Sequence, residues 1–170
     1  MNRAERNASN CLIIEGCYPT GISVMLEVLQ FLATFCTSIF AGAALYINLV
    51  EHPARRSLDT SAAVIEWATS YKRATFMQAP LAAIGFIAGT VVWLLSSGSG
   101  WLVAAVLIGT VIPFTFIGIM PTNRMLLAAH GDVGSEEMLF LLEKWGRLHA
   151  VRTILSLLAT LLMLWQLVVT

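Results

Sequence analysis

A long run without a charged side chain, residues 74–123, most restricts the fold of this chain. One transmembrane helix needs about 20 apolar residues, so this run is too long for a single crossing. The turn-forming sequence SSGSG, residues 96–100, interrupts it near the middle. The run therefore predicts two membrane-spanning helices, about residues 74–95 and 101–120, joined by a tight hairpin.

Two further apolar segments add two more spans. Residues 28–50 carry no charge and are long enough to cross the bilayer core, and no charge follows Arg152. The chain is 58% hydrophobic and only 12% charged, about half the charged fraction of a soluble domain. The sequence therefore predicts an all-α bundle of four transmembrane helices in a single membrane domain, residues 21–170. The expected spans are about 26–50, 74–95, 101–120 and 149–169.

Local signals indicate how the spans begin and end. Asp59 or Thr60 is a suitable N-cap for an amphipathic lead-in to the second span. Pro53 disfavours helical geometry at the residue before it and predicts a break or bend at the end of the first span. A helix that begins near Ser135 would extend the fourth span on its N-terminal side.

The distribution of basic residues predicts the orientation. Eight of the ten Lys and Arg residues lie in the connections 51–75 and 121–152, which four spans place on one side. The positive-inside rule assigns that side to the cytoplasm. We expect a multi-pass integral membrane protein with loops 51–75 and 121–147 in the cytoplasm. The membrane would be that of the endoplasmic reticulum or a vesicle in a eukaryote, and the inner membrane in a bacterium.

The N-terminal segment, residues 1–20, is polar and differs from a cleaved signal peptide. Its Cys11 and Cys17 could form a disulfide in an oxidising compartment. The formal net charge is zero and no basic cluster is interleaved with aromatic residues, so nucleic-acid binding is not expected. The lipid bilayer is the expected partner, and the oligomeric state stays open, a homo-oligomer included.

The four-span topology brings polar residues together at one end of the bundle. Trp145, His149 and Arg152 lie at i, i+4 and i+7, on one face of a helix. The other members of the predicted cluster are Asn48, Glu51, His52, Tyr71, Arg73, Thr75, Gln78, Thr115, Asn123 and Arg124. Polar groups at membrane depth are typically paired and functional.

Each member also has a plainer interpretation. Trp145 and Tyr71 could be aromatic residues of the membrane interface. Asn123, after a proline, could be a helix C-cap. The basic residues Arg55, Arg56, Lys72 and Arg147 are expected to be topogenic or headgroup charges.

Two chemistries fit two histidines, a glutamate and an arginine. In the first, a neutral His149 or His52 is a general base, while Arg152 and Asn123 stabilise an oxyanion on the substrate. In the second, the two histidines and Glu51 bind non-haem iron or another divalent metal. Glu51 and His52 are adjacent in sequence and about 100° apart on a helix, so joint binding of one metal needs a distorted backbone.

Three motifs resemble those of the anthrone oxygenase-like membrane proteins. The first is AGAALYINLVEHPAR, residues 41–55; the second is MPTN, residues 120–123, with Leu126 and Leu127; the third is KWGRLHAVR, residues 144–152. Their order and spacing are similar to that family over about residues 25–168.

The resemblance implies a four-helix membrane protein. Characterised fungal members of the family oxidise polyketide anthrones to anthraquinones with molecular oxygen and without a flavin or haem. The positions that match the family motifs are Asn48, Glu51, His52, Asn123, Trp145, His149 and Arg152, together with Tyr71. No cofactor other than O2 is then expected, and the substrate would be a small apolar aromatic molecule, an anthrone-like polycycle.

Such a substrate has an acidic methylene group opposite a carbonyl group. A monooxygenase of this kind needs a base, which His149 or His52 could be, and donors to an oxyanion. Arg152, Asn123 and Tyr71 are candidates for the donors, and Asn48 and Glu51 would line the substrate site. Its apolar slot could be lined by Phe114, Phe116 and Trp145.

A non-catalytic scaffold or transport protein is the alternative from another functional class. The polar cluster would then be a network that holds the helices together, for example through an ion pair between Glu51 and Arg152. A binding site requires an open cavity of substrate size among these residues, whereas a structural network would be packed shut.

Overall fold

The computed structural model describes residues 20–96, 98–128 and 134–169, and almost all of them are helical. The helices are α2 (Thr20–Tyr46), the π-helix η1 (Ile47–Glu51), α3 (His52–Arg56), α4 (Thr60–Ser96), α5 (Ser99–Phe114), the π-helix η2 (Thr115–Ile119), α6 (Met120–Leu127) and α7 (Glu136–Val169). No strand occurs in these ranges. The predicted N-terminal segment and its cysteine pair lie outside the described residues.

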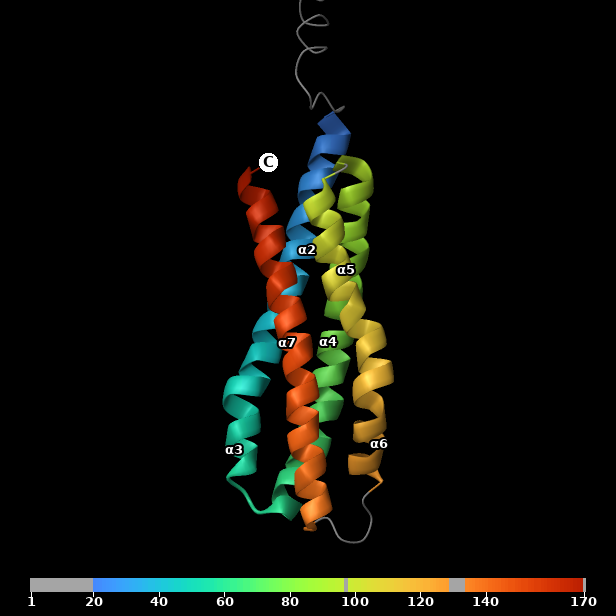
Figure 1. Cartoon of the computed structure of the whole chain (residues 1–170). Coiled ribbons are helices and arrows are strands. Elements are labelled where there is room, and N and C mark those ends of the chain that lie inside the picture. Colours follow the sequence, from blue (N-terminus) through green and yellow to red (C-terminus); the bar gives the residue numbers. More distant parts are fainter. Residues whose placement is uncertain (1–19, 97, 129–133, 170) are drawn as a thin grey trace, which may run out of the picture.

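These elements form four long rods, each apolar and long enough to cross a membrane: Gly21–Arg56, Thr60–Ser96, Ser99–Leu127 and Glu136–Val169. They stand side by side, and α2 and α5 each pack against both α4 and α7 (Figure 1). The predicted all-α bundle with four spans and an extended fourth helix is therefore confirmed, and the protein is a multi-pass membrane protein.

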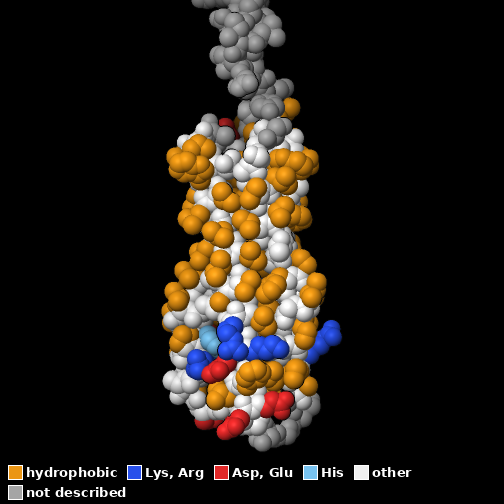
Figure 2. All heavy atoms as spheres, viewed as in Figure 1, with side chains coloured by type: hydrophobic (Ala, Val, Ile, Leu, Met, Phe, Trp, Pro, Cys, Tyr) orange, Lys and Arg blue, Asp and Glu red, His pale blue; other side chains and the backbone are white. Residues whose placement is uncertain are grey.

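The rods are longer than a bilayer core. At 1.5 Å per residue, α4 is about 55 Å long, against about 30 Å of hydrocarbon. Basic side chains gather in a band at the α3 and α6 end, with acidic side chains beyond it and an apolar surface on its other side (Figure 2). A basic band beside an apolar surface is typical of a membrane boundary, and the rods are long enough to project past the bilayer core at that end.

Two buried clusters correspond to these two regions. One, the span core, contains Phe40, Trp101, Ile108 and Met163 among its residues and lies in the apolar part of the bundle. The other, the cap core, is built around Trp67, Leu142 and Trp145. The polar residues of the predicted site lie between the two cores.

The first span does not break at Pro53, so of the predicted break or bend the break was wrong. Instead the helix widens into the π-helix η1, in which the His52 N–H bonds to the Ile47 carbonyl five residues back. η2 repeats the arrangement, with the Met120 N–H bonded to the Thr115 carbonyl. Each π-helix ends two residues before a proline. A proline has no N–H and its ring crowds the carbonyl four residues back, and a wider turn relieves that contact while the helix continues.

The remaining helix ends also differ from the predicted ones. The third span continues to Leu127, and Ala128 is its C-cap. Asn123 lies inside α6 and is completely buried, so its interpretation as a C-cap was wrong. The second span and its lead-in form one continuous helix, α4, which runs through Pro80.

Asp59 caps α4, as the sequence predicted. Its carboxylate accepts hydrogen bonds from the Ser61 hydroxyl (2.6 Å) and the backbone N–H of Ala62 (3.0 Å). Because these bonds favour the ionised form, the pKa of Asp59 is held below its usual range.

We expect Asp59→Ala to lower the thermal unfolding temperature slightly near neutral pH, because the cap is lost. The pKa of Asp59 is lower in the folded state, so its contribution is complete above the unfolded pKa of about 3.9 and is lost as the pH falls through the folded value. The difference in unfolding temperature between wild type and variant, measured in detergent, should therefore shrink towards acid pH. A difference that stays constant would contradict this role.

Candidate functional site

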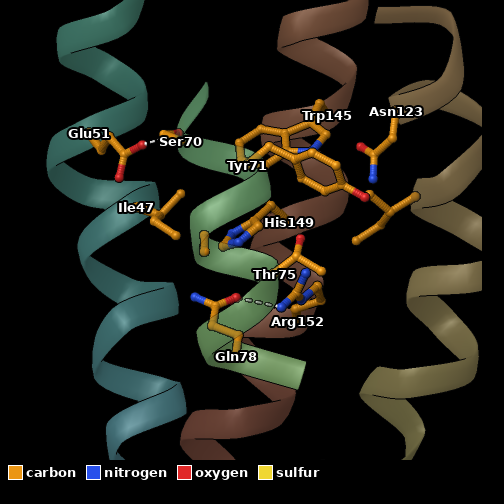
Figure 3. Close-up of a pocket in the computed structure, with 12 residues that line it drawn as sticks. Ile47, Glu51, Ser70, Tyr71, Thr75, Gln78, Asn123, Trp145, His149 and Arg152 are labelled. Carbon is orange, nitrogen blue, oxygen red and sulfur yellow. Dashed lines mark hydrogen bonds between the residues drawn. The ribbon is translucent and has the colours of Figure 1, made fainter. Parts of the chain in front are cut away.

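A polar chamber lies between the helices just on the membrane side of the cap core. The side chains of Tyr71, Asn123, His149 and Arg152 project into it from α4, α6 and α7 (Figure 3). Its volume is about 20 Å³. The full lining is Ile47, Glu51, Ser70, Tyr71, Ala74, Thr75, Gln78, Ile119, Asn123, Trp145, His149 and Arg152. Eight of the thirteen residues predicted for the polar cluster therefore line the chamber, whereas Arg73 and Arg124 are exposed.

A much larger apolar cavity of about 300 Å³ adjoins the chamber. It shares Tyr71, Thr75, Gln78 and Arg152 with the chamber and is otherwise lined by Phe40, Ala79, Ala82, Ala83, Val111, Ile112, Thr115, Phe116 and Met120. Phe116 is 64% exposed, so this cavity reaches the lipid-facing surface between α4 and η2. An apolar ligand dissolved in the bilayer therefore has a direct path to Arg152.

A third space, the side groove of about 370 Å³, lies between α2 with η1 and α4. Glu51, Ser70 and Gln78 line both the groove and the chamber. Gln78 therefore lies at the junction of all three spaces.

His149 is held by a hydrogen-bonded group in the bundle interior. Asn48 donates from Nδ2 to the Gly146 carbonyl (3.2 Å), which fixes its Oδ1 towards α7. That oxygen accepts from the Thr153 hydroxyl (2.6 Å) and lies 2.7 Å from His149 Nδ1. Since Oδ1 is an acceptor only, His149 Nδ1 must carry the proton. In a neutral imidazole, Nε2 is then the nitrogen with a free lone pair.

Arg152 is positioned at the wall between the chamber and the apolar cavity. It donates from Nη2 to Gln78 Oε1 (2.7 Å), and its guanidinium carbon lies 5.2 Å from the centre of the Phe40 ring. Both contacts come from other helices, α4 and α2. They direct the guanidinium towards the space where a ligand would bind.

Aromatic rings and a buried ion-pair network close the chamber on the cap side. Trp145 lies 4.8 Å from the His149 ring and meets Trp67 edge-on at 5.9 Å between centroids. Arg55 lies 5.8 Å from Trp145 and forms ion pairs with Glu51 and Glu66. Trp145 is only 5% exposed, so it is not an aromatic residue of the membrane interface.

Arg55 was expected to be a topogenic charge, and that interpretation was wrong. It is 3% exposed, and besides its two ion pairs it donates to the Ser70 hydroxyl (2.9 Å). The predicted ion pair between Glu51 and Arg152 is not formed. The Glu51 carboxylate instead binds Arg55 and accepts from Ser70.

A sequence model described as anthrone oxygenase matches residues 67–162, more than half of the chain. The chain is also similar to the anthrone oxygenase tpcL of Aspergillus fumigatus, with 36% identity over 73 residues, 41% of this chain and 45% of that protein. The chain thus aligns with less than half the length of this curated relative. No solved structure matches.

The chain belongs to the anthrone oxygenase family. The matched region contains Tyr71, Asn123, Trp145, His149 and Arg152, five residues of the chamber wall. Asn48, Glu51 and His52 precede it. Their place in the site therefore rests on the structure, which joins Asn48 to His149 and Glu51 to Arg55.

His52 packs against other side chains and lies outside the chamber, whereas His149 lines the chamber. His52 is 8% exposed and lines none of the three spaces, and its ring packs 5.6 Å from Trp145. A Cβ atom on Gly146 would lie 2.3 Å from His52 Nε2, so only glycine leaves room for this ring. Phe114, expected in the apolar slot, instead packs against the cap core and does not line a described cavity.

The residues of the alternative metal site are separated. Glu51 is paired with Arg55, and His52 faces Gly146. Within residues 20–96, 98–128 and 134–169, no group of three or more His, Cys, Asp or Glu side chains is arranged to hold a metal ion. The backbone dihedral angles of Glu51 and His52 are those of an α-helix, so the distortion that joint binding of one metal requires is absent between these two residues.

Several site residues were missed at the sequence level. Thr153 follows His149 by four residues, so helical spacing alone could have placed it on the same face. Ser70 and Glu66 gave no comparable signal, because their role depends on the rotation of Arg55 towards α4. Gly146 is used twice, as an acceptor for Asn48 and as the surface on which His52 packs.

We expect Gly146→Ala to destabilise the protein by about 1–3 kcal/mol, the usual cost of overfilling a packed interior. The added methyl group meets the His52 ring, which must move against Trp145. The measurement is thermal or denaturant unfolding of purified protein. Gly42→Ala is the matched control, because nothing lies within 4 Å of a Cβ atom there and the change should be neutral or slightly stabilising. Equal stabilities of the two variants would argue against the packing of His52 on Gly146.

Proposed function

We propose that this membrane protein is an oxygenase that oxidises a flat, anthrone-like polycycle with O2 by base-assisted deprotonation, without flavin or haem. Membership of the anthrone oxygenase family supports an oxygenase-type enzyme. The observation that carries the proposal is an oriented imidazole, His149, in a chamber that opens into an apolar cavity of about 300 Å³. The cavity expected of a binding site, as opposed to a closed structural network, is present.

The substrate supplies the reducing electrons. The methylene group of an anthrone is acidic because its anion is delocalised over the carbonyl group and the rings. Proton transfer to His149 Nε2 gives this anion, which can reduce O2 directly. The overall reaction is balanced without a further reductant: the methylene compound and O2 give the ketone and one water.

Each site residue has a role in the proposed reaction that follows from its position. Asn48 and Thr153 hold His149 in the tautomer with a free Nε2, as a carboxylate or carbonyl does for other catalytic histidines. Arg152 lies at the boundary of the chamber and the cavity, where its positive charge stabilises the bound anion. Tyr71, which lines both spaces, can donate to the same anion, and Asn123, which lines the chamber alone, can donate to negative charge that develops at the chamber edge. Exclusion of water by the surrounding apolar walls strengthens all of these interactions.

The surface of the bundle indicates how the ligand enters and how the protein is oriented in the membrane. The apolar cavity takes its ligand laterally from the bilayer, and the basic band lies at the membrane boundary. By the positive-inside rule we propose that the α3 and α6 end faces the cytoplasm, in an endoplasmic reticulum, vesicle or bacterial inner membrane. All residues of the proposed site come from one chain. The site therefore does not require a homo-oligomer and is compatible with one.

We predict that His149→Ala lowers the rate of anthrone oxidation by about 100- to 10,000-fold, the usual contribution of a general base. Oxygen uptake by the purified protein in lipid nanodiscs, with an added anthrone, is the measurement. His52→Gln provides the comparison, and we expect a much smaller loss, because His52 lines no cavity. The reverse order of the two losses would make His52 the base.

The metal-dependent alternative, with His52, His149 and Glu51 as ligands, predicts a different response to chelators. We expect oxygen uptake to persist after prolonged dialysis against EDTA and to be unaffected by added Fe²⁺. The expectation follows from the ion pair that occupies Glu51 and from the separate packing of His52. Loss of activity on dialysis and recovery with iron would support the metal site instead.

A further inference from the structure

Four buried nitrogen donors around the polar chamber have no hydrogen-bond partner among the described residues. They are Asn123 Nδ2, Gln78 Nε2, Trp145 Nε1 and Arg152 Nε, and Asn123 Oδ1 is one unpaired acceptor beside them. Asn123 is completely buried and Gln78 is 3% exposed. Buried donors are almost always paired in folded proteins, so such a concentration around one small space indicates a bound acceptor.

The size of the chamber restricts that acceptor. The chamber volume of about 20 Å³ is enough for one small molecule the size of water, which needs about 10–15 Å³. A tricyclic ring system cannot enter it and must occupy the apolar cavity of about 300 Å³. Thr75, Gln78 and Arg152 form the common wall, so an atom at the edge of the ring system meets whatever the chamber holds.

We propose that the polar chamber is the oxygen site, which holds O2 against the reacting carbon and binds the peroxide anion formed from it. This inference rests on the proposed function and adds to it a place for the second substrate. The carbanion transfers one electron to O2, and the two radicals join in a carbon–oxygen bond. The resulting peroxide anion lies beside the unpaired donors of Asn123, Trp145 and Arg152 and takes the proton from His149. Loss of the second carbon-bound hydrogen as a proton, with departure of hydroxide, gives the ketone and water.

The position of His149 determines which edge of the anthrone, the methylene or the carbonyl edge, faces the chamber. His149 lines the chamber and does not line the apolar cavity. In an anthrone the carbonyl oxygen and the methylene carbon lie at opposite sides of the central ring. If the carbonyl oxygen filled the chamber, the methylene would lie in the far part of the apolar cavity, out of reach of His149. The methylene edge therefore faces the chamber, and the free donors surround the carbon at which oxygen is added.

The aqueous side of the chamber is closed in a way that suits a peroxide. Trp145 covers His149, Trp67 backs Trp145, and Glu51, paired with the buried Arg55, forms part of the chamber wall beside them. This arrangement separates an unstable anion from bulk water, while the apolar cavity admits O2, which is more soluble in lipid than in water.

The test is Asn123→Leu, which keeps the approximate volume and removes the completely buried donor. The protein is assayed in nanodiscs with an anthrone, and kcat/KM for O2 is obtained from oxygen uptake at varied O2. We expect it to fall about 100-fold, the usual effect of one lost donor to a developing oxyanion. Anthrone affinity, measured without oxygen by quenching of tryptophan fluorescence, should change less than about twofold. Asn123→Asp is the second variant, in case the leucine variant does not fold. It keeps the shape of the side chain but adds a negative charge, so it should also lower kcat/KM for O2.

Ala83→Leu is the matched control, because Ala83 lines the apolar cavity and not the chamber. It should weaken anthrone binding and leave kcat/KM for O2 unchanged at saturating anthrone. If Asn123→Leu weakens anthrone binding and leaves the O2 dependence unchanged, the chamber holds an oxygen of the organic ligand and the inference is overturned. The same holds if neither quantity changes, as for a structural water. If the wild-type protein consumes no O2 with any anthrone, the proposed function fails, and the oxygen site with it.

Discussion

The hydrogen bonds of one side chain, Asn48, join the first and last spans and are the contacts on which the site depends. Asn48 Oδ1 joins His149 Nδ1 and the Thr153 hydroxyl, and its amide nitrogen reaches the Gly146 carbonyl. Polar groups buried in a lipid-embedded bundle are expensive unless they are paired, so these four groups specify how α2 with η1 is placed against α7. The same contacts determine which imidazole nitrogen can accept a proton. Packing and chemistry are therefore set by one group of residues.

The two π-helices make this arrangement compatible with continuous rods. η1 and η2 each add a residue to one turn, just before Pro53 and Pro121. The extra residue rotates the helix that follows, so Arg55 turns inward to Glu66 on α4, while Asn48 on the preceding turn still faces α7. The wider turn relieves the contact between each proline ring and the preceding turn at the level of the site.

Spacing and charge were sufficient to predict the spans and the end of the bundle that carries the chemistry. Charge-free segments set the number of helices, and i, i+4, i+7 spacing placed Trp145, His149 and Arg152 on one face, as the structure has them. What failed was local geometry. A proline motif was interpreted as a break, Asn123 as a cap and Arg55 as a surface charge, because the π-turns are not encoded in any simple periodicity. The two histidines could not be told apart either. Their difference depends on Gly146, where the lack of a side chain allows His52 to pack tightly against α7.

The depth of the site explains why it combines a polar chamber with an apolar cavity. Gln78 and Arg152 each lie five residues inside the exposed basic residues Arg73 and Arg147, about 7–8 Å along the helix axis. At that depth an arginine near the boundary is tolerated with one good partner, here Gln78, and still retains donors for a ligand. Deeper in the membrane the same charge would need complete neutralisation, and nearer the aqueous side water would compete for its donors. Under the proposed function, a ligand that enters from the bilayer and becomes an anion would meet the charge of Arg152 in this layer, between the span core and the cap core.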